Sequence, residues 1–444
     1  MKKLYYKMDF VQTAPLRIGN YVSVETDSDL MLDGRGLPFI PGTSLAGIMR
    51  HLAVKLNKDN NIINHLFGIV DDQNNNTIIM PSAIIIGDAV LQRAVDKNKV
   101  YINRRDGVGL NEWGTVNGDS KYDFQIVETS ESFSSIIEWE GTDEQYANEI
   151  TGIIDPIMKH FAADGFRAGA RTSRGYGSLN VAVLKKEFEF PKELDAWIDY
   201  NAYDEHAFDN AEKLDGERDE RDVRVEITFA MKGTFSVRVN TARTELAEDG
   251  SIPDSVPLEN YKGNPIIPGT AWAGAFRHHM HDILRDIGLD KDDDRVKDLD
   301  SLFGMSHNNS GNSKSAITFS ETEVTIRNKE KQRTTVMRTA IDRFTSSSAN
   351  TALFTGMMYS GGEGKLNIIF NKGGVSEFYS RLLSACICDM HLGLMTVGGE
   401  ASVGRGLMHI TGIKVNDEDR LEQLIKCVND GDTLDFLKEV AINA

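Results

Sequence analysis

The sequence predicts an α+β protein that contains two similar domains in tandem. Three features point to this fold class: a recurring Pro-Gly-Thr segment, an alternating apolar strand upstream of each copy, and a glycine-rich turn downstream of each copy. Residues 38–51 (PFIPGTSLAGIMRH) and 265–278 (PIIPGTAWAGAFRH) are identical at nine of fourteen positions, at an offset of 227. Chance agreement would be roughly one position in fifteen at ordinary composition, so the chain contains an internal repeat.

Each domain is expected to begin with a half-buried strand and to continue into a helix. Apolar residues alternate with other residues at Leu4, Tyr6, Met8 and Phe10, and again at Val225, Ile227, Phe229 and Met231. This period of two is typical of a strand with one buried face. After each Pro-Gly-Thr, helical spacing relates Leu45, Ile48, Met49, Leu52 and Leu56, and likewise Trp272, Phe276, Met280, Ile283 and Leu284. Thr43 and Thr270 precede these stripes, where an N-cap is expected.

The remaining elements are expected in the same order in both copies. Short β-rich runs lie at 76–86 and 316–326, helices are expected at about 144–162 and 375–390, and final strands at 178–184 and 407–415. Strand, helix, strands, helix, strand is the ferredoxin-like order, so we expect two ferredoxin-like domains. Two further matches extend the repeat: Leu66-Phe67-Gly68 with Leu302-Phe303-Gly304, and Ile102-Asn103-Arg104 with Ile341-Asp342-Arg343.

The repeats set the expected domain boundaries. The first domain spans residues 1–186 and the second spans residues 223–415. Between them, residues 187–222 form an acidic connector with 14 acidic and 4 basic side chains, which we expect to be partly helical. The last segment, 416–444, predicts an amphipathic helix that docks either on the second domain, which we favour, or on a neighbouring subunit. Its apolar stripe is Leu421, Leu424, Ile425 and Val428.

Composition excludes several protein classes. The 444 residues carry a net charge of −18, with 40% hydrophobic and 26% charged side chains, which is the profile of a folded globular protein. No apolar run approaches the roughly 18 residues of a membrane span, and the start MKKLYYKMDF has no apolar signal core. The three cysteines include no CxxC pair, so neither a disulfide framework nor a zinc knuckle is expected. We expect a cytoplasmic protein with no membrane partner, whose acidic segments leave room for a local basic groove.

The two glycine-rich segments are candidate phosphate-binding turns. GARTSRGYG at 169–177 and GGEASVGRG at 398–406 each precede a final strand. Glycine lets backbone N–H groups approach an oxyanion, and arginine adds bidentate contacts; the alternative is a tight turn that needs positive φ. Recurrence in register favours a backbone cradle for a phosphodiester. The candidate residues are Gly169, Arg171, Arg174, Gly175, Gly177, Gly398, Gly399, Gly404, Arg405 and Gly406.

The start of each Pro-Gly-Thr helix is a second candidate for phosphate binding. Free N–H groups at a helix start bind anions, and Thr43 and Thr270 add hydroxyl groups. Arg50 and Arg277 lie off the apolar stripes and are expected to face solvent or a ligand. On the same reasoning, the other candidate phosphate contacts are Arg104, Arg105 and Arg343.

A polar loop with an aspartate precedes each Pro-Gly-Thr helix. Asp27 lies eleven residues before Pro38, and Asp254 lies eleven before Pro265. A carboxylate beside phosphate-binding turns can hold a divalent cation or help to activate a ribose hydroxyl. The alternative is a solvated loop aspartate. His51 and His278 also match between the copies, but no catalytic triad or HEXXH pattern is present.

These residues resemble the RAMP superfamily of CRISPR-associated proteins, most of all the backbone subunit of type III effector complexes, here duplicated in one polypeptide. The matching segments are PFIPGTSLAGIMR and PIIPGTAWAGAFR, the two LFG elements, IDRFT at 341–345, and SRGYG and SVGRG. The resemblance implies RNA-recognition-type ferredoxin-like domains with inserted loops and thumb hairpins, acting in antiviral defence. The implied partners are a guide CRISPR RNA, a complementary target RNA and other CRISPR effector subunits, and the implied RNA-binding residues are the phosphate candidates named above.

The resemblance also implies a chemistry. In cleaving members of the family, an aspartate in the loop before the Pro-Gly motif supports metal-dependent cutting of target RNA. By position Asp27 and Asp254 match it, which implies that both are catalytic and bind Mg²⁺ or Mn²⁺. The reaction would be in-line attack by a ribose 2′-hydroxyl, which needs held geometry and charge neutralisation. Ser28-Asp29 and Ser255-Val256 stand where the family usually has Asn-Pro.

Three alternatives stay open. The first is a non-catalytic guide-RNA scaffold of the same complex. The second is a guide-processing endoribonuclease, which would need a general base such as His51 or His278. The third is a duplicated α/β protein that binds a small anionic ligand, and this alternative predicts no salt-dependent RNA binding.

Overall fold

The computed structural model divides the chain into two compact units. Unit 1 comprises residues 1–104, 123–172 and 176–219, and unit 2 comprises residues 105–122, 173–175 and 220–444. The described residues are 2–20, 25–56, 59–73, 76–93, 100–110, 116–141, 144–216, 218, 222–239, 253–290, 292–304, 306–307, 311–312, 314–371, 374–430 and 437. Parts of the connector and most of the segment after residue 430 therefore lie outside the described residues.

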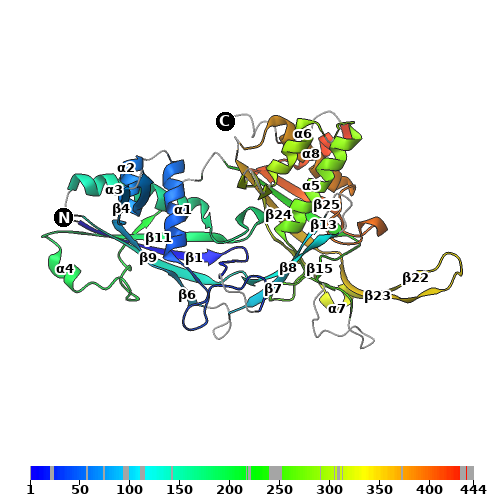
Figure 1. The fold of residues 1–444 in the computed structure, drawn as a ribbon, viewed down its shortest axis with the longest axis horizontal. Coiled ribbons are helices and arrows are strands. Elements are labelled where there is room, and N and C mark those ends of the chain that lie inside the picture. Colours follow the sequence, from blue (N-terminus) through cyan, green and yellow to red (C-terminus); the bar gives the residue numbers. More distant parts are fainter. Residues whose placement is uncertain are drawn as a thin grey trace. The chain divides into compact units, whose positions relative to one another are not determined.

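The sheet of unit 1 is built around the predicted first strand (Figure 1). Strand β1 (Lys2–Gln12) pairs antiparallel with β11 (Ser178–Glu189) on one side and with β9 (Ser132–Gly141) on the other. The other edge of β9 pairs with β5 (Ile84–Ile86) and β6 (Ala89–Arg93). The minor strands are β2 (Phe39–Ile40) beside β6, and β10 (Phe166–Arg167) and β12 (Glu212–Leu214) beside β11. The alternating residues of β1 are all buried, as predicted.

Three helices cover one face of this sheet and form the core with it. They are α1 (Gly42–Lys55), α2 (Asn60–Phe67) and α3 (Glu144–Asp164). The predicted stripe of α1 is confirmed, because Leu45, Met49 and Leu52 are buried. The predicted N-caps are wrong: α1 begins at Gly42 after Pro41, and no side chain caps it. Proline fixes φ near the helical entry value, so the chain turns before the threonine is reached.

The connector folds onto the opposite face of the same sheet. It contains α4 (Leu194–Ile198), which confirms the prediction that it is partly helical. Trp197 donates from Nε1 to the Tyr5 hydroxyl at 3.0 Å. Phe188 and Phe208 are buried in this second cluster beside Tyr5. The acidic connector therefore covers an apolar sheet face with its aromatic residues.

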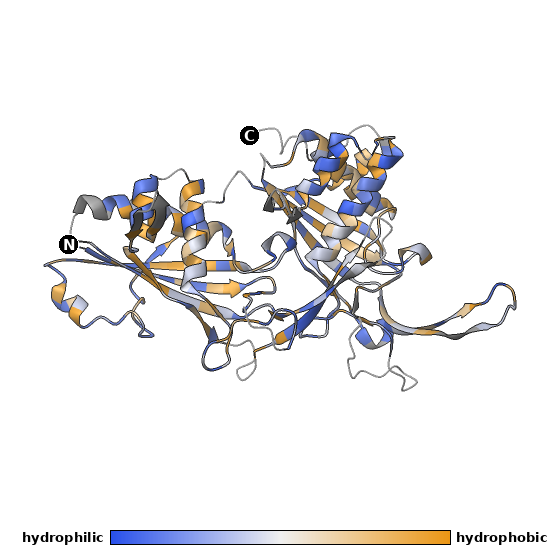
Figure 2. Ribbon diagram, in the orientation of Figure 1, coloured by the Kyte–Doolittle hydropathy of each residue, from blue (hydrophilic) through white to orange (hydrophobic). Residues whose placement is uncertain are grey.

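Unit 2 repeats this arrangement. Strand β13 (Asp222–Lys232) lies between β25 (Leu407–Val415) and β24 (Glu363–Asn371), and β24 also pairs with β20 (Ile317–Phe319) and β21 (Thr322–Thr325). The covering helices are α5 (Gly269–Asp286), α6 (Asp294–Leu302), α8 (Glu377–Leu392) and α9 (Leu421–Asp430). Edge strands are β17 (Ile266–Ile267) and β26 (Glu418–Asp419). In Figure 2 hydrophobic residues concentrate on the central strands and the inner sides of the helices of each unit.

The C-terminal helix docks on unit 2 as predicted. Leu424 and Cys427 are buried in the core of unit 2, whereas Ile425 is 43% exposed.

The predicted N-cap of the second Pro-Gly-Thr helix is also wrong. As in α1, Thr270 lies inside its helix, since α5 begins at Gly269 after Pro268 without a side-chain cap.

Each repeat inserts a long hairpin before its third main strand. The first is β7 (Ile102–Leu110) with β8 (Val116–Val127), and the second is β22 (Arg333–Ile341) with β23 (Ser348–Ser360), which follows α7 (Lys329–Gln332). Ile102 begins its hairpin, whereas Ile341 ends a strand at the hairpin tip. Residues 102–104 and 341–343 therefore occupy different positions in their hairpins, so the predicted correspondence between these two segments is wrong.

The remaining strands are short or local. They are β3 (Ile69–Gln73) with β4 (Asn76–Met80), β14 (Thr234–Phe235) beside β23, β15 (Arg238–Val239) with β16 (Val256–Pro257), and β18 (Ser306–His307) with β19 (Gly311–Asn312).

Candidate nucleic-acid interface

The two glycine-rich turns share one unusual backbone. Four residues with positive φ recur in the same order: Gly169, Arg171, Gly175 and Gly177 (83°, 62°, 85°, 74°), and Gly398, Glu400, Gly404 and Gly406 (94°, 66°, 78°, 73°). A 3-10 helix lies inside each turn, at Thr172–Arg174 and at Ala401–Val403. Positive φ is unstrained only for glycine. The repeat of the sequence is thus a repeat of the turn's conformation.

Four glycine N–H groups of the two turns donate to backbone carbonyl groups of the protein itself. The pairs are Gly177 to Pro15, Gly399 to Ser236, Gly404 to Ala401 and Gly406 to Thr234, with N···O distances of 2.7, 2.9, 2.9 and 3.0 Å. A Cβ at Gly177 or Gly406 would collide with the carbonyl oxygen of Ala168 or Val397. The predicted backbone cradle is therefore wrong at these four glycines. Gly177, Gly399 and Gly406 hold their turn against the segment that follows the first strand, and Gly404 bonds within its own turn.

The first residue of each Pro-Gly-Thr helix is packed against other parts of the protein. The Gly42 N–H at the start of α1 donates to the Asp88 carboxylate at 2.7 Å. A Cβ at Gly269 of α5 would meet the carbonyl oxygens of Phe319 and Arg174. At Gly42 a carboxylate thus takes the place that a phosphate would need, and Gly269 is packed closely against backbone carbonyl groups. Thr43 is exposed and Thr270 half-buried beside these occupied positions.

Three of the predicted phosphate-binding arginines stabilise the fold instead. Arg50 donates to the Gly68 carbonyl at 2.8 Å and to Asn64 at 2.7 Å. Arg277 donates to Asp300 at 2.8 Å. Both arginines therefore fasten a Pro-Gly-Thr helix to the helix that follows it. Arg105 is 2% exposed and pairs with Glu321 at 3.1 Å. Because its charge is buried and compensated inside unit 2, Arg105 is not available to RNA.

Cations and aromatic rings cluster at the first turn. The guanidinium groups of Arg17 and Arg171 lie 4.7 and 4.5 Å from the Phe124 ring centroid. The Tyr176 ring lies 6.0 Å from the same ring, and Arg174 is exposed at the end of the 3-10 helix. Phe124 and Tyr176 are buried, at 2% and 3% exposure, so their rings support the arginines and offer no surface for stacking on bases. Arginine groups placed in this way are suited to contacts with RNA phosphates. Arg17 and Phe124 were not predicted, because they come from segments far from the turn in sequence.

The second turn is electrostatically different. Arg405 lies 2.5 Å from the Glu400 carboxylate, and Arg338 of β22 pairs with the same carboxylate. Arg343 is exposed at the tip of hairpin β22–β23, next to Phe344, whose side chain is 99% exposed. This hairpin extends away from the sheet of unit 2 (Figure 1). Its tip is held by Asp342, which accepts from the N–H groups of Phe344 and Thr345 at 2.8 and 2.9 Å, and these bonds lower the Asp342 pKa.

The two predicted aspartates occupy equivalent places. Asp27 accepts from the N–H of Asp123 on β8 at 3.0 Å, and Asp254 accepts from the N–H of Thr355 on β23 at 2.7 Å. Both aspartates are exposed. In the first repeat, the Asp27 N–H also donates to the Asp123 carboxylate at 2.8 Å, and that carboxylate pairs with Arg104. Each aspartate thus joins its loop to the second strand of its hairpin.

The donor sets at the aspartates are sparse. The described residues contain no group of three His, Cys, Asp or Glu side chains able to hold a metal ion. Mg²⁺ usually keeps several waters and binds through one or two carboxylates plus a phosphate of the substrate. Asp27 with Asp123, or Asp254 alone, fits that mode of binding but not an all-protein site.

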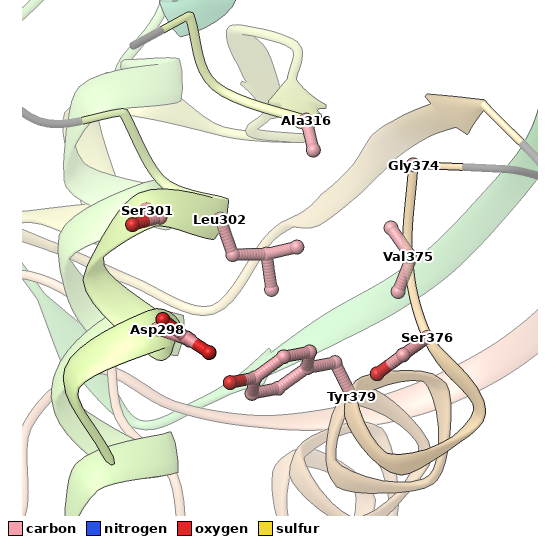
Figure 3. A pocket seen from close by; sticks show the side chains of 8 residues that line it. All are labelled: Asp298, Ser301, Leu302, Ala316, Gly374, Val375, Ser376 and Tyr379. Atoms are coloured by element: carbon pink, nitrogen blue, oxygen red, sulfur yellow. The ribbon is translucent and has the colours of Figure 1, made fainter. Parts of the chain in front are cut away.

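Two other features lie apart from this chemistry. His51 is exposed on α1, and His278 Nε2 lies 3.6 Å from the Asp282 carboxylate on α5. A small pocket of unit 2 is lined by α6 and the start of α8, and Figure 3 shows Asp298 and Tyr379 facing it. Its lining residues include no cationic side chain and one carboxylate, Asp298, so this pocket does not resemble the arginine-bearing turns. Within the described residues, no helix has the length and apolarity to cross a membrane.

Comparison with known protein families gives a match over both repeats. A family model described as "RAMP superfamily" matches residues 12–180 and 221–409. The two matched regions correspond to the two sequence repeats and together cover most of the chain. No curated protein matches the sequence.

Proposed function

The chain belongs to the RAMP superfamily, and from this premise we propose that it is a guide-RNA-binding backbone subunit of a type III CRISPR ribonucleoprotein that also cleaves the bound target RNA. Family membership indicates a CRISPR-associated, RNA-binding protein. We further propose that the chain is two tandem ferredoxin-like domains. The strand order supports this, because the fourth main strand lies beside the first, the first beside the third, and the third beside the second in both units.

One observation carries the cleavage proposal: the chain places the same aspartate against the same hairpin strand twice. The Asp27 and Asp254 carboxylates accept from Asp123 and Thr355 at corresponding points of β8 and β23. A target strand that follows both hairpins would pass both carboxylates. Two exposed carboxylates in equivalent positions predict two cuts at a fixed spacing.

The residues of this chain would act by positioning and by charge. The arginines at the first turn and Arg343 at the hairpin tip would bind phosphates, so base pairing with the guide rather than the protein would select the sequence. The aspartate would orient the ribose 2′-hydroxyl for in-line attack on its own phosphodiester. When bound there, Mg²⁺ or Mn²⁺ would neutralise charge on the phosphate. This chemistry needs no histidine, and we infer that it operates in the cytoplasm with the other effector subunits.

The test is charge removal that keeps the hydrogen bond. Asp27→Asn and Asp254→Asn retain an oxygen that can accept from the hairpin N–H, so the loop stays attached while its charge is lost. In the assembled complex, each variant should lose one of the two cuts, with the cleavage rate at that site lowered by about 10²-fold or more. Guide binding should be unchanged.

Asp33→Asn is the matched control. Asp33 lies in the same loop, but its carboxylate pairs with Arg35 and not with the hairpin. The complex that contains Asp33→Asn should cleave target RNA at the wild-type rate. Full cleavage by the Asp27→Asn, Asp254→Asn double variant would overturn the assignment.

A non-catalytic scaffold is the second candidate, and one observation favours it. Each aspartate already makes a hydrogen bond that joins its loop to its hairpin. If that is its whole role, the asparagine variants should bind guide RNA normally and the wild-type complex should not cut target RNA in Mg²⁺ or Mn²⁺.

A further inference from the structure

The charge of one residue is reversed between turns whose backbones match. Arg171 and Glu400 occupy the same place in the two glycine-rich turns, with φ of 62° and 66°. A left-handed conformation is strained for a residue other than glycine. Glycine lies directly before Glu400 at position 399, so the turn does not lack glycine, and a charged residue is kept at the strained position in both repeats.

The two side chains have opposite effects on the arginines around them. In the first turn, Arg171 adds a second guanidinium over the Phe124 ring, which Arg17 also contacts. In the second turn, the Glu400 carboxylate pairs with Arg405 through one oxygen and with Arg338 through the other. The Glu400 and Arg405 side chains are 11% and 14% exposed, whereas Arg338 is 41% exposed.

A carboxylate held between two arginines resembles a bound phosphate. Arginine forms bidentate bonds with carboxylate and phosphate by the same geometry. A nucleic-acid phosphate can bind Arg338 and Arg405 fully only if it takes the place of Glu400. Arg338 is partly exposed, so a phosphate can approach this arginine from solvent and compete with Glu400 for it.

We propose that Glu400 is an internal competitor for RNA phosphate: it occupies Arg338 and Arg405, so the second glycine-rich turn binds RNA more weakly than the first. This inference rests on the proposed RNA-binding function and adds that the two repeats bind RNA with unequal strength. The first turn is the main backbone contact. The second turn engages RNA only when Glu400 gives up its arginines.

The experiment measures RNA affinity of the full chain as a function of salt. The probe is a fluorescently labelled single-stranded RNA, and the variant is Glu400→Gln, which keeps the shape of the side chain and removes its charge. Because each phosphate contact on a single strand adds about 0.7 to the slope of log K against log salt, Glu400→Gln should steepen that slope by about 0.7–1.4. At about 0.15 M salt we expect its Kd to be at least roughly threefold lower than that of the wild type.

Glu418→Gln is the matched control. It makes the same change in net charge in unit 2 and removes a carboxylate paired with Arg420 at 2.7 Å. Its Kd and salt slope should stay close to those of the wild type. If Glu418→Gln strengthens binding as much as Glu400→Gln does, the effect is one of net charge and the proposal is overturned.

A double-variant cycle separates competition from a structural effect. Arg338→Gln should weaken binding little in the wild type, where Arg338 is occupied, and should remove most of the gain in the Glu400→Gln background. Equal effects of Arg338→Gln in both backgrounds would refute the competition. If Glu400→Gln folds poorly, Glu400→Gly tests the same point, because glycine suits the positive φ.

The two proposals fail differently. Absence of salt-dependent RNA binding by the wild type would overturn both the proposed function and this inference. RNA binding by the wild type, with Glu400→Gln indistinguishable from it, would overturn the inference alone.

Discussion

Individual residues show how one backbone can carry different chemistry in two repeats. Asp123 and Thr355 donate equivalent backbone N–H groups, yet only Asp123 adds a carboxylate, and that carboxylate pairs with Arg104. Arg171 and Glu400 differ in the sign of their charge at the same φ. The backbone geometry is therefore maintained by glycine and hydrogen bonds, and the side chains are left to set the charge at each site.

His391 gives a residue-scale prediction of pH dependence. Burial lowers its pKa below 6.5, and the neighbouring His409, with its ring centroid 4.3 Å away, lowers it further. Below about pH 6.5 the unfolded chain binds a proton at His391 that the folded chain resists. Stability should thus be complete above that pH and should fall as the pH drops toward the folded pKa.

The measurement is the unfolding midpoint of the wild type and of His391→Gln at about pH 7.5 and 5.5. Because the variant has no proton to bind at this position, its midpoint should fall less on acidification. An equal fall in both proteins would show that the pKa of His391 is the same in the folded and the unfolded chain.

At the scale of elements, local sequence patterns predicted the first strand and first helix of each repeat but missed the second helix and the inserted hairpin. The alternation of β1 and β13 and the stripes of α1 and α5 were readable, because each element buries one periodic face. The second helices α2 and α6 were not predicted, since the sequence of α6 reads as an acidic surface segment. Strand β22 and the tip of hairpin β22–β23 bury none of their described side chains, so no periodic apolar face marks them in the sequence, and the thumb role was inferred from the family resemblance.

The same limit applied to the candidate site. Arg50 and Arg277 lie off the apolar stripes, but whether such an arginine meets RNA or a neighbouring helix depends on α2 and α6. Arg105 looked like a surface cation beside Arg104, yet the fold buries it against Glu321. The aspartates were found because their spacing to the Pro-Gly-Thr motif is the same in both repeats.

The tip of hairpin β22–β23 carries an element-scale prediction. Phe344 is 99% exposed, so Phe344→Ala should change the free energy of unfolding by no more than about 0.5 kcal/mol. Stacking of an aromatic ring on a base contributes about 1–3 kcal/mol. If the hairpin is a thumb against RNA, the variant should therefore bind guide-paired target RNA about 5- to 150-fold more weakly in a titration.

Leu353→Ala is the control on the same hairpin. Leu353 is 60% exposed and apolar but has no aromatic ring. Its loss should leave RNA affinity nearly unchanged. Equal weakening by both variants would mean that apolar contact, not stacking, is what the hairpin provides.

At the scale of the whole molecule, the compact units do not coincide with the sequence repeats. Residues 105–122 and 173–175 come from the first repeat but belong to unit 2. The second repeat keeps its own hairpin and its own turn in addition. Unit 2 thus contains parts from both repeats, and a cut within the connector would separate residues that fold together.

The pair of Arg105 and Glu321 tests this shared construction. The two side chains are 2% and 10% exposed and lie 3.1 Å apart. Removing one partner of a buried pair leaves an uncompensated charge and costs about 3–5 kcal/mol. Glu321→Gln should therefore lower the free energy of unfolding of the full chain strongly, as measured by denaturant titration.

The exposed pair of Arg327 and Glu363 provides the comparison. These side chains are 85% and 62% exposed at 3.2 Å, so Glu363→Gln should cost less than about 1 kcal/mol. The charge-swapped variant Arg105→Glu, Glu321→Arg should recover part of the stability that either single swap loses, because the pair is restored in reverse. Similar small losses for Glu321→Gln and Glu363→Gln would show that the hairpin of the first repeat does not contribute to the stability of unit 2. A large loss at Glu321 alone would show that the second half of the sequence depends on the first for its own stability.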